Sequence, residues 1–228
     1  MNIAVVLAGG SGSRFGGGMP KQFLDLDGRT VVEHSIDVFE QSAVIDEVAV
    51  VVHPDYCDLM RGIAERRGWT KLKEIIHGGN ERYLSSLHAI DTYANRFGTS
   101  MENHNIILHD AARPWISEEI IERTVSELLD HEAVAVGIPC IDTIWQSSAD
   151  AVAPCIKSVP PRSLMWRAQT PQAFRLSLIH RAYHIGLQQS DFAATDDCGV
   201  VLRYCPEVSI HIVEGSENNR KITFHDDL

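Results

Sequence analysis

Short apolar runs of strand length alternate with longer segments of helical periodicity from the start of the chain to Pro139. The apolar runs cover residues 3–7, 48–52, 72–76, 106–108 and 133–138. The helical patterns cover residues 31–39, 56–66, 81–96 and 118–131. Strands that alternate with helices of about ten to fifteen residues indicate βαβ units. The alternation therefore predicts an α/β fold with a doubly wound, mainly parallel sheet, which binds ligands at the carboxyl ends of its strands.

The regular alternation ends at Pro139. Residues 140–171 show no helical pattern, but residues 141–146 and 153–159 are short extended candidates on either side of a polar stretch. This pattern predicts an inserted β-hairpin, which has too little core to be stable alone. We therefore expect a single domain over residues 1–228, with residues 140–166 as a protruding arm that packs on a second subunit. Helices over 176–188 and 196–204 and a strand over 208–213 complete the predicted domain.

The net charge of −11 limits the kinds of partner that suit the chain. Nucleic acids and anionic membranes need a cationic footprint, so neither is expected as a partner. The apolar runs are far shorter than the roughly 18 residues that would suggest a membrane span, and the first residues lack the pattern of a signal peptide. We therefore expect a cytoplasmic protein. An anionic ligand must therefore be bound by local cationic side chains or backbone N–H groups, because the overall electrostatic field of the protein repels it.

A glycine-rich loop over residues 8–21, AGGSGSRFGGGMPK, follows the first predicted strand. Glycines let backbone N–H groups approach an anion closely, and such concave N–H groups bind phosphate. The dinucleotide pattern G-x-G-x-x-G fails at Phe15, and the P-loop pattern fails because Gln22 follows Lys21. The remaining pattern, G-G-x-G-x-R followed by P-K, fits and includes Arg14 and Lys21. This loop resembles the signature loop of nucleotidyltransferases that join a nucleoside monophosphate to a sugar phosphate or polyol phosphate.

Four further stretches extend the resemblance over nearly the whole chain. They are GGNER with Ser85, HDAARP, QTPQAF and VEG with KIT, at residues 78–85, 109–114, 169–174 and 213–223. Together with the loop they are similar to the family of 2-C-methyl-D-erythritol 4-phosphate and D-ribitol-5-phosphate cytidylyltransferases. The resemblance implies a Rossmann-like homodimeric enzyme that transfers CMP from CTP to a polyol phosphate. It also implies release of pyrophosphate and a requirement for Mg²⁺.

The resemblance implies a role for each matching residue. The catalytic residues would be Arg14, Lys21 and Lys221. The nucleotide would contact Ala8, Gly9, Gly10, Gly12, Gly79, Asn80, Ser85, Asp110 and Ala111. The acceptor would contact Arg113, Thr143, Arg162, Thr170 and Thr195. Asp110 is the candidate ligand of Mg²⁺, and Thr143 and Arg162 match arm residues that reach into the site of the neighbouring subunit.

These residue types suit the implied chemistry. Phosphoryl-type transfer is catalysed chiefly by positioning and by charge stabilisation, so cations around the α-phosphorus matter more than a base. A phosphate monoester has a second pKa of about 6 and is already largely dianionic at neutral pH. It can therefore attack without a general base. Arg14 suits forked contact with phosphate oxygens, and Lys21 suits a point charge.

The arm sequence bears on the acceptor. Methylerythritol enzymes usually carry basic residues on both sides of the Asp-Thr pair of the arm, whereas residues 140–146 read CIDTIWQ. The sequence PPR at residues 160–162 is also nearer to the ribitol enzymes, although residues 166–172 are common in methylerythritol enzymes. We expect D-ribitol 5-phosphate as the acceptor, with 2-C-methyl-D-erythritol 4-phosphate as the alternative. A hexose-phosphate pyrophosphorylase and a noncatalytic nucleotide sensor are further alternatives.

The chain offers few signals of a transition-metal site. It holds eleven histidines but no H-E-x-x-H motif, and the helical pair His180 and His184 has no third ligand nearby in sequence. We interpret that pair as surface residues. Asp196 and Asp197 are expected at a helix N-terminus, where carboxylates are favourable.

Overall fold

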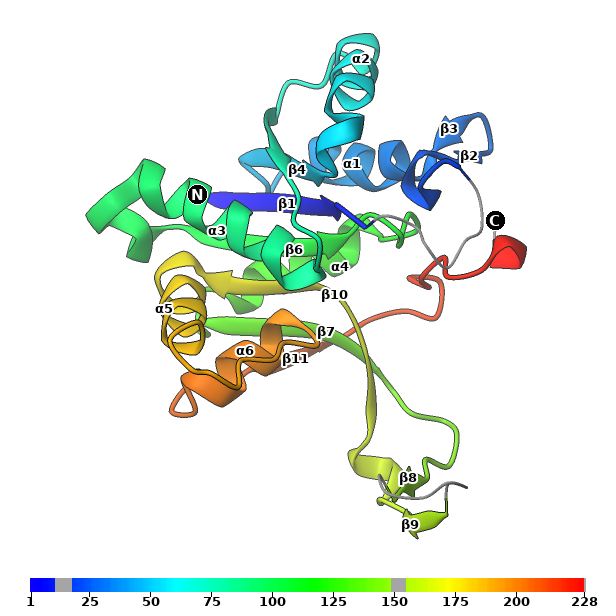
Figure 1. The fold of residues 1–228 in the computed structure, drawn as a ribbon, viewed down its shortest axis with the longest axis vertical. Coiled ribbons are helices and arrows are strands. Elements are labelled where there is room, and N and C mark those ends of the chain that lie inside the picture. The colour runs from blue at the N-terminus through cyan, green and yellow to red at the C-terminus, as the bar shows by residue number, and fades with distance from the viewer. Residues whose placement is uncertain (11–17, 149–154, 228) are drawn as a thin grey trace.

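A seven-stranded sheet forms the centre of the computed structural model, which describes residues 1–10, 18–148 and 155–227 (Figure 1). The strand order is β11-β7-β10-β6-β1-β4-β5. The strands are β1 (Asn2–Ala8), β4 (Glu47–Val52), β5 (Leu72–His77), β6 (Asn105–Asp110), β7 (Ala133–Pro139), β10 (Trp166–Arg175) and β11 (His211–Glu214). Only β10 runs antiparallel to its neighbours within this sheet. The predicted α/β class with a mainly parallel sheet is confirmed.

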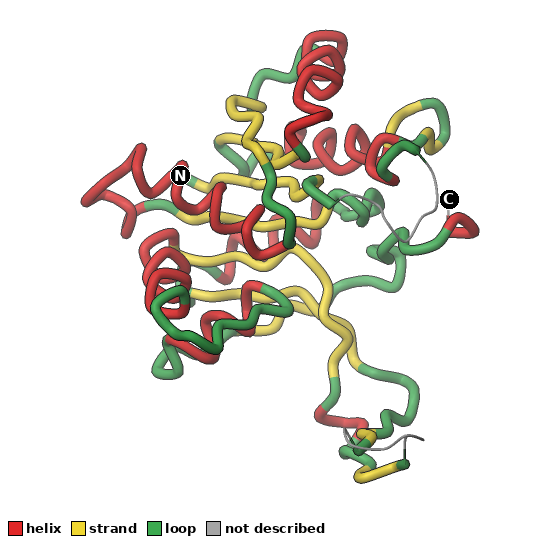
Figure 2. Tube along the Cα trace, in the orientation of Figure 1, coloured by secondary structure: helices red, strands yellow, loops and turns green. Residues whose placement is uncertain are grey.

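Helices cover both faces of the sheet (Figure 2). The helices are α1 (Val31–Gln41), α2 (Cys57–Arg67), α3 (Arg82–Phe97), α4 (Glu118–Glu127), α5 (Leu176–Gly186) and α6 (Asp197–Tyr204). Helices α1, α2 and α4 contribute to one core, and α3, α5 and α6 contribute to the other. Successive side chains of β1 alternate between the two cores, because Ala4 and Val6 belong to the first and Ile3 and Val5 to the second. This alternation is what a doubly wound sheet requires.

Several helices begin at residues that satisfy the first backbone N–H groups. Thr30 and Glu33 form a capping box at the start of α1, and the Ser117 hydroxyl accepts from the Ile120 N–H at the start of α4. Asp196 caps α6, where its carboxylate accepts from the Gly199 N–H at 2.8 Å. The interpretation of Asp196 as a residue of a helix N-terminus is therefore confirmed.

Strand β10 is not predicted from the sequence. Residues up to 171 are expected in the arm or its surroundings, whereas Trp166–Arg175 is a strand between β6 and β7. Gln169, Thr170 and Gln172 interrupt the apolar pattern, yet all three side chains are buried. Their polar groups are satisfied by hydrogen bonds to distant residues, which no local pattern can indicate.

Smaller elements complete the structure. The strands β2 (Asp25–Leu26) and β3 (Arg29–Thr30) form an unpredicted hairpin, whose turn places Asp27 and Gly28 at positive φ. Short 3-10 helices cover Lys21–Phe23, Pro54–Tyr56, Gly98–Asn103, Arg162–Leu164 and His225–Asp227. No helix within the described part of the chain is both long enough and apolar enough to cross a membrane.

The segment between β7 and β10 projects away from the sheet as an arm (Figure 1). Its strands β8 (Gln146–Ser147) and β9 (Ile156–Ser158) pair antiparallel, so the predicted hairpin is present but shorter than expected. Large apolar side chains are exposed along it, namely those of Ile141, Ile144, Trp145, Ile156, Val159 and Leu164. An exposed apolar surface of this kind is typical of an interface.

Candidate active site

A pocket of about 380 Å³ opens at the carboxyl ends of β1 and β6, where a doubly wound sheet binds ligands. It is lined by Leu7, Ala8, Gly9, Gly10, Lys21, Gln22, Gly79, Asn80, Glu81, Arg82, Ser85, Asp110, Ala111, Ala112, Lys221 and Thr223. The structure thus brings together the predicted nucleotide contacts and the two predicted catalytic lysines that it describes. Gly12 and Arg14 were predicted for the same site, but they lie outside the described residues.

Backbone segments approach one another closely on one side of the pocket. A Cβ atom added to Gly9 would lie 2.6 Å from the Ser85 hydroxyl, and one added to Gly79 would overlap Leu84 Cβ. Ser85 also accepts a hydrogen bond from the Gly79 N–H at 3.2 Å. The absence of side chains at these glycines therefore lets the two loops approach each other closely, because any larger residue would separate them. It also leaves the backbone accessible to a ligand.

We expect Gly79→Ala to weaken the binding of CTP. The added methyl group must displace Leu84, the third residue of α3, and so shift the loop that precedes the helix. The KM for CTP should rise by about tenfold, the equivalent of roughly 1.4 kcal/mol of binding energy. Gly62→Ala is the matched control, because a Cβ atom there meets nothing within 4 Å and Gly62 lies inside α2. Equal KM values for the two variants would contradict this role of Gly79.

Gln22 is a site residue that the sequence analysis missed. It is buried, and its Nε2 donates to the backbone oxygens of Ala8 and Gly10 at 2.6 and 2.9 Å. The two bonds fix the chain where it leaves β1. The only sequence signal for this role is that a polar residue directly follows Pro20-Lys21. That position alone does not show whether the amide is buried or exposed.

Asp110 lies at the centre of a charged network. Its carboxylate accepts from Lys221 Nζ at 2.7 Å and from Arg82 Nε at 3.1 Å. Arg82 also donates to Asp197 at 2.8 Å, and the Asp197 side chain is fully buried. Burial raises the pKa of Asp110, but the attraction of Arg82 and Lys221 outweighs it and holds that pKa well below its usual range. Asp110 is therefore ionised at neutral pH.

Arg82 lies in the GGNER stretch, but the sequence predicts no role for it. It is the first residue of α3, where the helix dipole is unfavourable to a cation. A cation in that position needs anionic partners. An arginine at the predicted start of a helix is therefore a signal that carboxylates lie nearby. In the structure the partners are Asp110 and Asp197, which lie 28 and 115 residues away in sequence.

A chain of hydrogen bonds supports Asp110 from behind. The Asp110 N–H donates to Thr170 Oγ1, which lies 3.0 Å from His109 Nδ1, and His109 Nε2 lies 3.1 Å from the Arg113 carbonyl oxygen. Burial lowers the pKa of His109 to about 4, so the ring is neutral at pH 7. Because a carbonyl only accepts, Nε2 carries the proton and Nδ1 accepts from Thr170. The hydroxyl of Thr170, a predicted acceptor contact, is buried and occupied within the protein.

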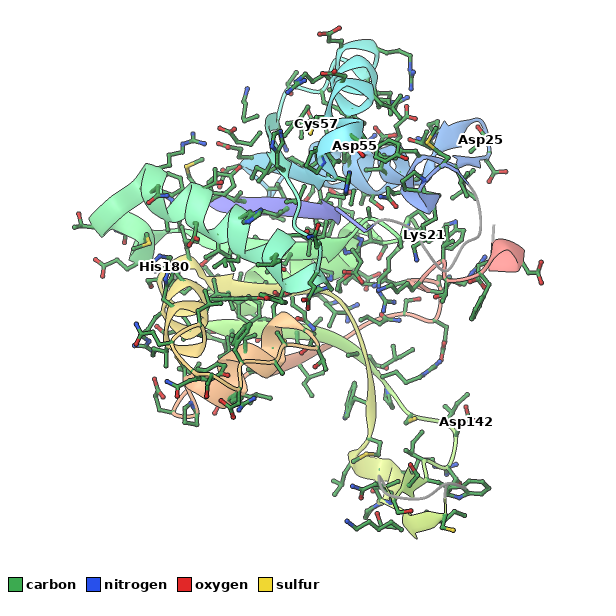
Figure 3. The ribbon with its side chains drawn as sticks, viewed as in Figure 1. Lys21, Asp25, Asp55, Cys57, Asp142 and His180 are labelled. Carbon is green, nitrogen blue, oxygen red and sulfur yellow. The ribbon has the colours of Figure 1, made fainter. Side chains whose placement is uncertain are left out.

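The two lysines reach the pocket from opposite ends of the chain. Lys21 Nζ donates to the Ile222 carbonyl oxygen at 2.6 Å, and the Ile222 N–H donates to the Ala112 carbonyl oxygen at 2.8 Å. These bonds hold the C-terminal segment against the loops that follow β1 and β6. Figure 3 labels Lys21, which lies beside that segment. Both lysines thus lie in one cationic wall together with Arg82.

The other predicted acceptor contacts lie outside this pocket. Arg113 is largely engaged, because it donates to the backbone oxygens of Asn219 and Ala168 at 2.7 and 3.3 Å. Thr195 is exposed just before α6. Thr143 and Arg162 are exposed on the arm, whose distance from the pocket can be followed from the labelled Asp142 in Figure 3. The described chain therefore does not bring its own arm to its own pocket.

Two of the pocket-lining residues carry carboxylates, Glu81 and Asp110. Glu81 is exposed, whereas Asp110 is buried at the base of the cationic wall. Each carboxylate oxygen can accept more than one bond, so the contacts with Arg82 and Lys221 leave lone pairs on Asp110. Mg²⁺ is commonly held by one or two carboxylates together with substrate phosphates. The donor set around Asp110 therefore fits the predicted Mg²⁺ ligand.

A doubly wound sheet with close glycine loops and a cationic wall at its carboxyl edge suits a nucleotidyltransferase, and the relatives of the chain carry that activity in their names. More particularly, the chain belongs to the 2-C-methyl-D-erythritol 4-phosphate cytidylyltransferase family, whose model matches residues 2–228. Relatives named as enzymes of this kind confirm that the protein is a cytidylyltransferase that uses CTP. The predicted family is thereby confirmed.

Individual relatives refine this assignment. The 2-C-methyl-D-erythritol 4-phosphate cytidylyltransferase of Thermobifida fusca is 42% identical over 99% of this chain and 89% of its own length. The bifunctional ribulose 5-phosphate reductase/CDP-ribitol pyrophosphorylase of Haemophilus influenzae is 39% identical over 100% of this chain but only 46% of its own length. The crystal structure of 4-diphosphocytidyl-2C-methyl-D-erythritol synthase from Anaerococcus prevotii superposes with a TM-score of 0.84 at 27% identity, covering 100% of this chain and 92% of that one.

Proposed function

We propose that this cytidylyltransferase transfers CMP from CTP to 2-C-methyl-D-erythritol 4-phosphate and releases pyrophosphate. The observation that carries the proposal is the wall of Lys21, Arg82 and Lys221 beside the glycine loops, because it suits a triphosphate. The acceptor rests on the relatives, since the family model and the 42% identical protein both carry that name. This acceptor is the alternative of the sequence analysis rather than its first choice.

D-ribitol 5-phosphate is the second candidate acceptor. It was the first expectation from the arm sequence, and the 39% identical CDP-ribitol pyrophosphorylase supports it over the whole of this chain. The methylerythritol relatives are more numerous among the similar proteins and include the more identical one. We therefore rank the methylerythritol substrate first.

The proposed mechanism relies on positioning and charge. An oxygen of the acceptor phosphate attacks the α-phosphorus of CTP and forms the new bond, while the bond to the bridging oxygen of the β-phosphate breaks and pyrophosphate leaves. The acceptor phosphate is already dianionic, so no side chain has to remove a proton. Lys21 and Lys221 stabilise the charge that develops on the phosphate oxygens, and the backbone at Gly9 and Gly10 cradles the triphosphate.

Asp110 would hold Mg²⁺ together with the phosphates of CTP. The ion would neutralise phosphate charge during the transfer. Asp110 is suited to the task because it stays ionised and because Arg82 and Lys221 fix both of its oxygens. The same two cations prevent its carboxylate from turning away from the pocket.

The arm would complete the site in a homodimer. Its exposed apolar side chains, among them Trp145 and Leu164, lack a covering surface within the described chain. Covering them with a second copy would remove apolar area from water. Thr143 and Arg162 would then reach the pocket of the partner, and Arg162 would hold the phosphate of the acceptor. This arrangement accounts for the separation between these residues and the pocket of their own chain.

The acceptor is tested by measuring pyrophosphate release from CTP and Mg²⁺ with three candidate acceptors. We expect kcat/KM for 2-C-methyl-D-erythritol 4-phosphate to exceed that for ribitol 5-phosphate by at least about tenfold, and a hexose 1-phosphate to be inactive. A higher kcat/KM for ribitol 5-phosphate would reverse the ranking of the acceptors. Failure of all three would refute the proposed reaction.

Mixing two impaired variants tests the shared site. In a mixed dimer of Lys21→Ala and Arg162→Ala subunits, one site carries both defects and the other carries neither. Random mixing makes half of the dimers mixed, so about a quarter of the wild-type activity should return. Differently tagged subunits confirm that mixed dimers form. An absence of recovery in confirmed mixed dimers would contradict the exchange of arms.

A further inference from the structure

Two histidines of α5 and one aspartate of α3 converge where these two helices pack together. Asp91 Oδ1 lies 2.9 Å from His184 Nε2 and 3.8 Å from His180 Nε2. All three ligand atoms lie within 4.8 Å of one another (Figure 3 labels His180). No third ligand lies near the histidine pair in sequence, but folding places Asp91 beside it. The ligand comes from another helix, nearly ninety residues away in sequence.

The two distances from Asp91 Oδ1 are close to the spacing between donor atoms around a tetrahedral ion. With bonds of about 2.1 Å, two donor atoms of such an ion lie about 3.4 Å apart. The two distances from Asp91 Oδ1 lie on either side of that value. His180 and His184 are four residues apart on one face of α5, the spacing by which helical histidine pairs bind zinc.

The orientation of the two rings also allows convergence. The His180 and His184 rings are tilted by 45° with centroids 4.2 Å apart. Because the two ring planes are not parallel, they intersect, and an ion can lie in the planes of both rings.

A second cluster in the same protein has the same donor types but the wrong orientation. His131 and His211 Nε2 each lie 3.5 Å from Glu127 Oε2. However, their rings are stacked and almost parallel, with an angle of 6° between them. An ion cannot lie in two stacked parallel planes, so the lone pairs do not converge. Both clusters bring their donor atoms close together. Only the cluster of Asp91, His180 and His184 also has ring orientations that allow both imidazoles to bind one ion.

We propose that Asp91, His180 and His184 bind one divalent transition metal of the Zn²⁺ class, with water completing the coordination. Two imidazoles and one carboxylate suit Zn²⁺, Co²⁺ or Ni²⁺ better than Mg²⁺ or Ca²⁺, which prefer oxygen ligands alone. The site is partly exposed, since between 30% and 46% of each side chain is accessible, so an ion can enter from solvent.

The bound ion would link α3 to α5 rather than take part in phosphate transfer. Asp91 follows Arg82 by nine residues, which places it about 14 Å further along α3. The two helices also meet through Asp197, which accepts from Arg82 of α3 and from Tyr183 of α5 at 2.8 and 2.7 Å. A metal link would therefore strengthen a contact that already supports Arg82.

The test measures Zn²⁺ binding by calorimetry and Co²⁺ binding by visible absorption, with EDTA-treated protein that carries no histidine tag. The background is Cys155→Ser, because the thiol of Cys155 is exposed and could bind Zn²⁺ itself. We expect one equivalent to bind. His184→Ala and Asp91→Asn should each weaken binding by at least about tenfold. The matched control is the double variant His131→Ala/His211→Ala, which should bind as the background does.

Thermal unfolding gives a second readout that does not depend on activity. With free Zn²⁺ at about 100 times the dissociation constant, the Tm of the background protein should rise by about 5 °C. This rise should disappear in His184→Ala and persist in the control variant. The proposal is overturned if the background binds no Zn²⁺, if binding survives His184→Ala, or if binding is lost in the control variant.

Discussion

Replacing Lys21 by alanine should lower kcat by about 100-fold to 1000-fold and leave the fold intact. The ammonium group lines the pocket and is held there by the Ile222 carbonyl oxygen at 2.6 Å. If it stabilises charge that develops during transfer, its removal lowers kcat and not only the affinity for CTP. The measurement is steady-state pyrophosphate release with saturating CTP and acceptor.

Lys73→Ala is the matched control for Lys21→Ala. Lys73 is an exposed lysine of β5 and is not among the residues that line the pocket. Its replacement changes the net charge equally and should leave kcat within twofold, roughly the range of a surface substitution. Far-ultraviolet circular dichroism and Tm verify that both variants fold. Near-normal turnover of Lys21→Ala would show that the catalytic cation lies elsewhere.

Replacing Arg82 by methionine should lower the free energy of unfolding by about 3 kcal/mol. The substitution leaves the fully buried Asp197 and the nearly buried Asp110 without a shared cation. The side chain of Arg82 is itself 30% exposed, so water offsets part of the loss and the low end of the usual range applies. Urea unfolding measures the change.

A double-mutant cycle separates charge from packing at Arg82. Adding Asp197→Asn to Arg82→Met removes the uncompensated carboxylate and should recover part of the lost stability. Arg123→Met is the control, because Arg123 pairs with an exposed Glu119 at 3.9 Å and should change stability by no more than about 0.5 kcal/mol. Strictly additive losses in the cycle would mean that the Arg82–Asp197 ion pair does not stabilise the protein.

Local patterns were reliable wherever the chain is apolar and periodic. The strands β1, β4 and β7 and the helices α1 and α3 begin and end within a few residues of the predicted ranges. Strand β10 was missed because its buried polar residues make no apolar pattern. Their partners lie on distant segments, and such pairing follows from the assembled sheet rather than from neighbours in sequence.

The residues of the candidate site also fall into two groups, those that the sequence indicates and those that only the fold brings to the site. The glycine loop and the two lysines were recognisable because glycine spacing and charge are local signals, and the sheet topology then placed them at one edge. Gln22, Arg82 and Asp197 were not assigned because their roles consist of hydrogen bonds and ion pairs over long sequence distances. The position of Thr170 behind Asp110 likewise depends on β10 lying beside β6.

The sequence by itself determined the class of fold and the family, and it predicted a phosphate-binding loop, since each depends on the order and spacing of residue types. The tertiary structure decided which charges meet. It joined Arg82 to Asp110 and Asp197, and it brought Asp91 to the histidine pair of α5. The physical reason is that electrostatic and metal-ligand interactions act over a few ångströms in space, and only folding sets those distances.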